Sequence, residues 1–162
     1  MEIKKLKKSE VFVFGSNEQG FHGAGAAGYA LRGDSRNNWR QDQWFLKAMR
    51  AQPGSRDRIG MWAVYGVAKG FQQGNEGMSY AIITKYSPSS KILYPIEKIE
   101  DQIRELFSFA VTKPDLIFLM TPVGGGLAGH ALQSLDKIWQ RIFSKKPLNV
   151  IASIDLYKSV MK

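Results

Sequence analysis

The stretch VFVFGSNEQGFHGAGAAGYA, residues 11–30, decides the fold of this chain. It begins with four apolar residues and reaches Gly15, a pattern typical of a strand buried on both faces of a parallel sheet. A polar loop follows. The small residues from 23 to 31 then predict a helix that opens on a glycine turn and lies close to its neighbours. A buried strand, a loop and a helix in succession indicate an α/β protein.

The rest of the chain continues this alternation. Apolar runs predict strands within residues 59–74, 79–87, 115–122 and 148–157, and helical periodicity predicts helices at 40–49, after Pro95, and at 131–143. We therefore expect one domain over residues 1–162, a three-layer α/β/α sandwich around a mixed, mainly parallel sheet. The polar, arginine-rich residues 33–58 are interpreted as an excursion that joins elements and is a candidate cover for the site.

Composition restricts the possible partners. The chain has no cysteine, which excludes disulfides and thiolate metal sites and fits a cytoplasmic location. Two widely separated histidines give no case for a metal site, and no cofactor is expected. No apolar run approaches the roughly 20 residues that span a bilayer, and no secretory signal is recognised. The net charge of +9 favours an anionic small ligand or a nucleic acid as partner.

Two glycine-containing loops each follow a predicted buried strand and precede a predicted helix. They are GSNEQGFHGAG, residues 15–25, and TPVGGGLAG, residues 121–129. In open α/β sheets ligands bind beyond the carboxyl ends of the strands, where helix N-termini offer free N–H groups to phosphate. Neither loop has the GxxxxGK[ST] pattern of a P-loop. Together the two loops favour a phosphate or nucleotide site over simple turns.

These motifs resemble those of the macrodomain family, whose members bind ADP-ribose. Asn17 followed by HGAGAA resembles the first loop of that family, TPVGGGLAG its diphosphate loop in the GCGL form, and SYAIITK the strand ending in Thr-Lys of one subclass. That subclass includes glycohydrolases that remove ADP-ribose from glutamate-linked protein or from thymine in DNA. The order of motifs is also similar to that in uncharacterised macro-like proteins of phages and bacteria. The resemblance covers about residues 11–155.

The resemblance implies roles for individual residues. Lys85 would be the reactive lysine at the glycosidic carbon, and Asn17 would lie near the ribose distal to adenine. An acidic residue follows the second loop in the protein-directed enzymes, whereas Ala128 and Gly129 follow Leu127 here, and the DNA-directed relatives also lack that acid. The expected ligand-binding residues are Gly15, Ser16, Asn17, His22, Gly23, Ala24, Gly25, Thr84, Thr121, Val123, Gly124, Gly125, Gly126, Leu127, Ala128, Gly129 and Tyr157.

Three functions remain open from the sequence. The first is binding of ADP-ribose or a related nucleotide derivative with hydrolysis of an ADP-ribosyl linkage on DNA or protein. The second is a non-catalytic reader or sponge of an NAD-derived nucleotide. The third is a nucleic-acid-binding module, in which Trp39, Trp44 and Trp62 would stack on bases beside the arginines of the excursion. For each residue a structural role competes: His22 as a local hydrogen-bonding group, Lys85 as a solvated side chain, and the tryptophans as packing groups.

Overall fold

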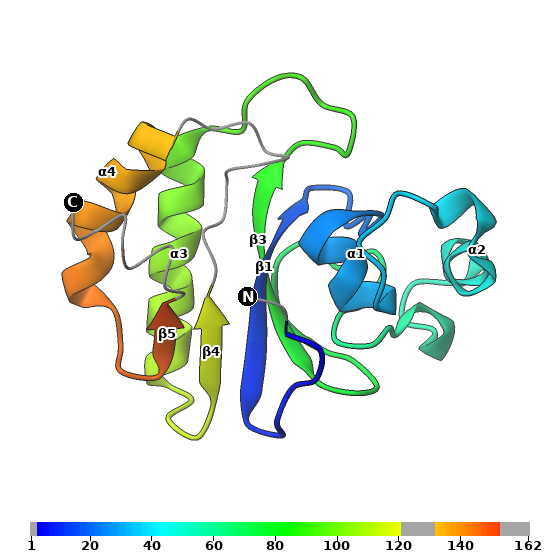
Figure 1. Ribbon diagram of the computed structural model, residues 1–162, viewed down its shortest axis with the longest axis horizontal. Coiled ribbons are helices and arrows are strands. Elements are labelled where there is room, and N and C mark those ends of the chain that lie inside the picture. The colour runs from blue at the N-terminus through cyan, green and yellow to red at the C-terminus, as the bar shows by residue number, and fades with distance from the viewer. Residues whose placement is uncertain (1–2, 121–131, 153–162) are drawn as a thin grey trace.

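The computed structural model describes residues 3–120 and 132–152 of the chain (Figure 1). Five strands form one sheet in the order β2-β3-β1-β4-β5. Parallel pairing joins β1 to β3 and β4, and β4 to β5, whereas β2 runs antiparallel to β3. The strands are β1 (Glu10–Asn17), β2 (Gly70–Gln73), β3 (Met78–Lys85), β4 (Ile117–Met120) and β5 (Val150–Ala152). The helices are α1 (Gly25–Arg32), α2 (Gln43–Arg50), α3 (Ile96–Val111) and α4 (Leu132–Ile142).

The central strand β1 is apolar on both faces because it lies between two hydrophobic cores. Val11 and Val13 pack in the core that α3 and α4 cover, and Phe12 and Phe14 pack in the core on the side of α1. Figure 1 shows α3 and α4 on one side of the sheet and α1 and α2 on the other. The prediction of a three-layer α/β sandwich with a mainly parallel sheet is confirmed.

Small residues let α1 pack closely against its surroundings. A Cβ atom at Gly28 would lie 3.0 Å from backbone atoms of both Gly23 and Asp34. The helix ends at Gly33, which has φ +75° and donates its N–H to the carbonyl of Tyr29 over 2.8 Å. A left-handed glycine of this kind is a common C-terminal stop for a helix. The helix predicted from the small residues is therefore confirmed, and its tight packing explains their use.

The apolar segment from residue 59 was expected to be a strand, and this was wrong. Residues 59–69 form turns, and the strand β2 begins only at Gly70. Met61 and Trp62 donate their N–H groups to the carbonyls of Leu31 and Ala30, over 2.8 and 2.7 Å. The segment therefore satisfies the C-terminal carbonyls of α1, which have no partner inside the helix. Its apolar character reflects burial, since Trp62 is 1% exposed.

The excursion at residues 33–58 folds onto the same core as α1. Its helix α2 begins after Asp42, whose Oδ1 accepts the N–H of Phe45 over 2.8 Å as an N-cap. Phe45 is fully buried, and its ring lies 5.2 Å from that of Phe21 in the loop after β1. The excursion is thus packed directly against the first glycine-containing loop.

Helix α3 closes an open edge of β3. It follows Pro95, as predicted, and buries Ile99, Ile103 and Leu106. Strand β2 pairs with β3 only from Met78 to Ala81, so the backbone of Ile83 has no strand beside it on that edge. Gln102 of α3 takes that place: its Oε1 accepts the N–H of Ile83 over 2.7 Å and its Nε2 donates to the carbonyl of Ile83 over 2.8 Å.

Within the described parts of the chain, no helix combines the length and apolar character needed to cross a membrane.

Candidate ligand-binding site

The structure brings Asn17 and Lys85 together at the carboxyl ends of two adjacent parallel strands. Asn17 is the last residue of β1 and Lys85 the last residue of β3, and the two are register partners beyond a bulge at residues 16 and 17. The N–H of Glu18 donates to the carbonyl of Lys85 over 3.0 Å, which joins the two strand ends. In open α/β sheets this edge is where ligands bind.

The Asn17 side chain shapes the loop that leaves β1. Its Oδ1 accepts the N–H groups of Gln19 and Phe21, over 3.1 and 3.2 Å, and its Nδ2 donates to the carbonyl of Phe21 over 2.9 Å. The side chain is buried, and an asparagine that bonds the backbone ahead of it stabilises a turn. Asn17 therefore holds the turn of residues 17–21.

Gly15 and the buried Ser16 and Thr84 form the base of this edge. The Ser16 hydroxyl donates to the carbonyl of Ala68, and the Thr84 hydroxyl donates to the carbonyl of Ser16 over 3.2 Å. A Cβ atom at Gly15 would lie 3.2 Å from Thr84 Oγ1, so a larger residue would displace that hydroxyl. These residues support the site from beneath by linking β1, β3 and the segment before β2.

Lys85 is half-buried, and its amino group is held by its own loop. Its Nζ donates to the carbonyl of Pro88 over 2.8 Å. This bond keeps the amino group close to the strand end. The arrangement leaves a cationic side chain at the edge where Asn17 lies, which suits an anionic ligand.

His22 is fully buried and acts as an anchor in this structure. Its ring Nε2 donates to the carbonyl of Val67 over 3.0 Å, and the ring meets Phe14 edge-on at 5.3 Å. Burial lowers the pKa of His22 to about 4, although hydrogen bonds to the backbone of Val67 and Val64 act in the opposite direction. The ring is therefore neutral at pH 7 and fixes the 64–67 segment to the loop after β1.

The loop glycines use their backbone groups within the protein. The N–H of Gly23 donates to the carbonyl of Phe21 over 3.1 Å, and the N–H of Gly25 donates to the carbonyl of Ser35 over 2.9 Å. Ala24 is the N-cap residue of α1 and makes no side-chain cap. The next amides of the first turn, those of Ala26 and Ala27, have no acceptor within the helix and remain as donors.

The second expected half of the site lies outside the described residues. Thr121, Val123, Gly124, Gly125, Gly126, Leu127, Ala128, Gly129 and Tyr157 belong to this group, as does His130. The described chain reaches Met120 at the end of β4, beside Val13 of β1.

The structure also shows a pair that sequence reasoning missed. Tyr94, buried just before α3, donates its hydroxyl to Glu18 Oε1 over 3.1 Å, and its ring lies 4.8 Å from that of Tyr86. Burial, together with the Glu18 hydrogen bond, raises the pKa of Tyr94 to about 12. This hydrogen bond from Tyr94 fixes Glu18, the residue that follows Asn17. No sequence signal links two residues that are so far apart in the chain.

All three tryptophans offered as a base-stacking surface pack against the core on the side of α1, Trp62 fully and Trp39 and Trp44 in part. Trp62 is 1% exposed and cannot stack on a base, so its expected place in a nucleic-acid-binding surface is wrong. The Trp39 ring meets Phe21 edge-on at 5.1 Å. Trp44 is half-buried beside α1.

Among the described residues, no three histidine, aspartate or glutamate side chains gather closely enough to hold a metal ion.

Comparisons with known proteins reveal similarity in structure but not in sequence. No family model matches the chain, and no curated protein matches it in sequence. A macrodomain from Oceanobacillus iheyensis, solved with MES bound, superposes with a TM-score of 0.54 at 11% identity, over 99% of this chain and 85% of that one. The chain has a macrodomain-like fold. A protein of unknown function from Bacteroides thetaiotaomicron gives a TM-score of 0.50 at 14% identity, over 91% of this chain and 89% of the other.

Proposed function

We propose that this protein binds ADP-ribose or a related nucleotide derivative at the carboxyl ends of β1 and β3. The observation that carries the proposal is the pairing of Asn17 with Lys85 at this edge of a macrodomain-like sheet. Ligands of open α/β sheets bind at that edge, and the positive end of a helix dipole there favours phosphate.

Each described part of the edge has a role in this proposal. The first turn of α1 offers the amides of Ala26 and Ala27 to a phosphate, and Lys85 lies at the neighbouring strand end, where the ribose would be placed. Gly15, together with the buried Ser16 and Thr84, supports the ligand from beneath. The segment after β4, with residues 121–129, and Tyr157 complete the proposed site.

The finer proposal is that the protein hydrolyses an ADP-ribosyl linkage on DNA or protein. In this reaction the amine of Lys85, after loss of its proton, attacks the anomeric carbon of the ribose, and the electron pair of the glycosidic bond leaves with the base or carboxylate. Water then releases ADP-ribose and restores the amine. The position of Lys85 at the strand end, held on Pro88, supports this role. A reader or sponge that binds without turnover is the alternative.

Calorimetry with ADP-ribose tests binding. A substitution of Ala26 tests whether the first turn of α1 contacts the phosphate. Ala26 is exposed in the first turn of α1, where an aspartate is compatible with the helix. Its carboxylate would repel a phosphate, so Ala26→Asp is expected to weaken ADP-ribose binding about tenfold. The isosteric Ala26→Asn has no charge and should bind nearly as the native protein does. Absence of native binding at about 1 mM ADP-ribose would refute the proposed function.

Turnover is tested separately with ADP-ribosylated DNA and ADP-ribosylated protein. Lys85→Ala should abolish release of ADP-ribose and leave its binding largely intact, whereas the exposed Lys91→Ala serves as the matched control. Recovery of unaltered substrate from the native protein would support the reader or sponge. Equal turnover by Lys85→Ala and the native protein would refute the lysine mechanism.

A further inference from the structure

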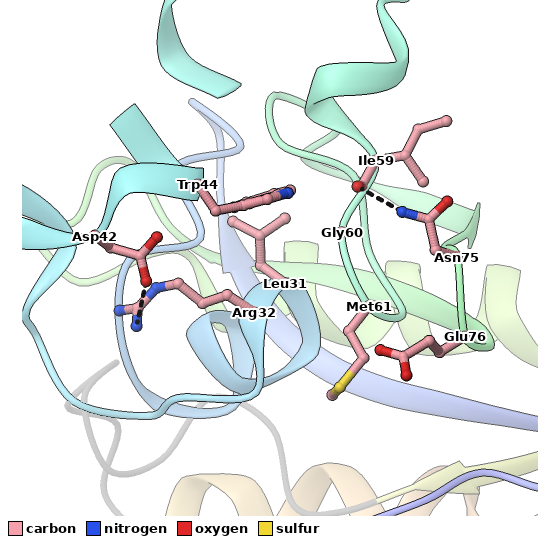
Figure 2. A pocket seen from close by; sticks show the side chains of 9 residues that line it. All are labelled: Leu31, Arg32, Asp42, Trp44, Ile59, Gly60, Met61, Asn75 and Glu76. Atoms are coloured by element: carbon pink, nitrogen blue, oxygen red, sulfur yellow. Dashed lines mark hydrogen bonds and ion pairs between the residues drawn. The ribbon is translucent and has the colours of Figure 1, made fainter. Parts of the chain in front are cut away.

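A cavity of about 260 Å³ lies at the other end of β3 from Lys85 (Figure 2). It is formed by the end of α1, the start of α2, and the segments at residues 59–61 and 75–76. Glu76 lies just before β3, and the eight residues of that strand separate it from Lys85 by about 23 Å. The cavity is therefore distinct from the proposed ADP-ribose site.

Part of the cavity wall is apolar and suits a flat body. Leu31, Trp44, Ile59 and Met61 line it. In Figure 2 the Trp44 ring lies on one side of the space and Met61 on the other, with Leu31 and Gly60 between them. An indole face attracts both planar groups and cations, and a methionine side chain adapts to either.

The nearby backbone donors are already used, so the unpaired polar atoms at the exposed rim are acceptors, whereas Nε and Nη1 of Arg32, which also lack hydrogen-bond partners, are buried. The N–H groups of Gly60, Asn75 and Glu76 donate to the carbonyls of Ala63, Gly60 and Met61, each over 2.8 Å. The Asn75 side chain donates through Nδ2 to the carbonyl of Ile59 over 3.0 Å. Asn75 Oδ1 and the Glu76 carboxylate remain as acceptors at the exposed rim. This chemistry suits a ligand that donates N–H groups.

The charges around the cavity also favour a cation. Arg32 is 3% exposed and is balanced by Asp34 and Asp42, with Nη1 3.4 and 3.8 Å from their carboxylates. Among the side chains that the structure describes, none forms an ion pair with Glu76. The rim therefore carries one uncompensated negative charge, although the whole chain has a net charge of +9. An anionic ligand would meet this carboxylate unfavourably.

We propose that this cavity binds a small organic cation with a flat apolar body, of the amidinium, guanidinium or amine type. Its charged nitrogen group donates to Glu76 and Asn75, and its body lies against Trp44 between the apolar walls. The site is independent of ADP-ribose binding, since no residue is shared with the edge at Asn17 and Lys85.

Calorimetry with benzamidine tests the site, with benzamide as its neutral analogue. Benzamidine should bind at millimolar concentration, and benzamide at least about tenfold more weakly, because it lacks the charge. Phenyltrimethylammonium has the charge but no N–H group, so it should also bind more weakly than benzamidine. Equal affinity for all three compounds, or no benzamidine binding at about 10 mM, would overturn the proposal.

Two variants localise the binding. Glu76→Gln should weaken benzamidine about tenfold and leave benzamide unchanged, whereas the exposed Glu97→Gln on α3 should have no effect. Trp44→Leu should weaken both compounds by removing the aromatic wall. Lys85→Ala should change neither, so this test succeeds or fails independently of ADP-ribose binding. Native affinity for benzamidine in Glu76→Gln would show that the cation binds elsewhere.

Discussion

Arg32, at the end of α1, donates a hydrogen bond from Nη2 to the carbonyl of Gly23, in the loop before the same helix, over 2.6 Å. The same nitrogen donates to the carbonyl of Arg36 over 2.8 Å. One buried guanidinium therefore joins both ends of α1 to the excursion. The shape of the first loop at the proposed site therefore depends on a residue nine positions beyond Gly23 in the chain.

Replacement of Arg32 should destabilise the fold strongly. Arg32→Met removes both hydrogen bonds and leaves Asp34 and Asp42 without their buried partner, at an expected cost of about 3 kcal/mol in the free energy of unfolding. Urea denaturation measures this change. Arg36→Met is the control, because the Arg36 side chain is 80% exposed and its loss should cost less than about 1 kcal/mol. Equal effects of the two variants would contradict the role given to Arg32.

His22 should make stability depend on pH. Its folded pKa of about 4 lies below the ordinary 6.5, so between these values the unfolded chain binds more protons and stability falls as pH falls. Between about pH 7 and pH 5 the loss due to this residue is about 2 kcal/mol. Urea denaturation at a series of pH values measures it.

The matched variant for this effect is His22→Gln, which cannot acquire a proton in this range. The free energy of unfolding of His22→Gln should change less between about pH 7 and pH 5 than that of the native protein, whatever its absolute stability. The comparison is restricted to this window because carboxylates titrate at lower pH. An identical pH dependence in the two proteins would rule out His22 as the source.

Two glycines should respond very differently to an added methyl group. A Cβ atom at Gly60 would lie 2.1 Å from the carbonyl oxygen of Leu31, a backbone atom that cannot move without breaking the end of α1. Gly60→Ala should therefore cost about 3 kcal/mol or prevent folding. At Gly54 the same methyl meets nothing within 4 Å, and only the φ of +87° opposes it, at about 1 kcal/mol. Thermal denaturation of both variants measures the two losses of stability. A larger loss in Gly54→Ala than in Gly60→Ala would refute this prediction.

Gln102 should be needed by the sheet as well as by its own helix. Gln102→Leu leaves the N–H and carbonyl of Ile83 without partners, and should cost about 3 kcal/mol in the free energy of unfolding. The exposed Gln140→Leu on α4 provides the control and should change stability by less than about 0.5 kcal/mol. Hydrogen exchange of the Ile83 amide adds a local measurement, and it should accelerate in Gln102→Leu only.

The sequence predicts those parts of the fold in which burial and periodicity agree. The four apolar residues before Gly15 and the apolar face of α3 gave correct elements because each is both buried and regular. The strand expected from residue 59 is wrong because Trp62 and Ala63 are buried without being in the sheet. Their N–H groups bond instead to the end of α1. No local pattern distinguishes these two uses of apolar residues.

For the proposed site, the sequence located the strand ends but not the bonds made there. Apolar runs predicted the two strands that carry Asn17 and Lys85, but only the structure shows that these strands are neighbours in the sheet. The amides of Gly23 and Gly25 donate to carbonyls within the protein, and Tyr94 donates to Glu18. The bonds of Gly25 and Tyr94 join segments that only the fold brings together. The cavity beside Trp44 likewise draws on four separate segments, which no single motif could reveal.

The glutamine that closes the edge of β3 has a consequence for assembly. An unpaired strand edge is a template on which a second chain can add, and such edges promote aggregation. Beyond Ala81 the groups of β3 that an incoming strand would pair with are those of Ile83, and Gln102 occupies both. The edge of β3 at Ile83, two residues before Lys85, is therefore closed to β-augmentation by another polypeptide.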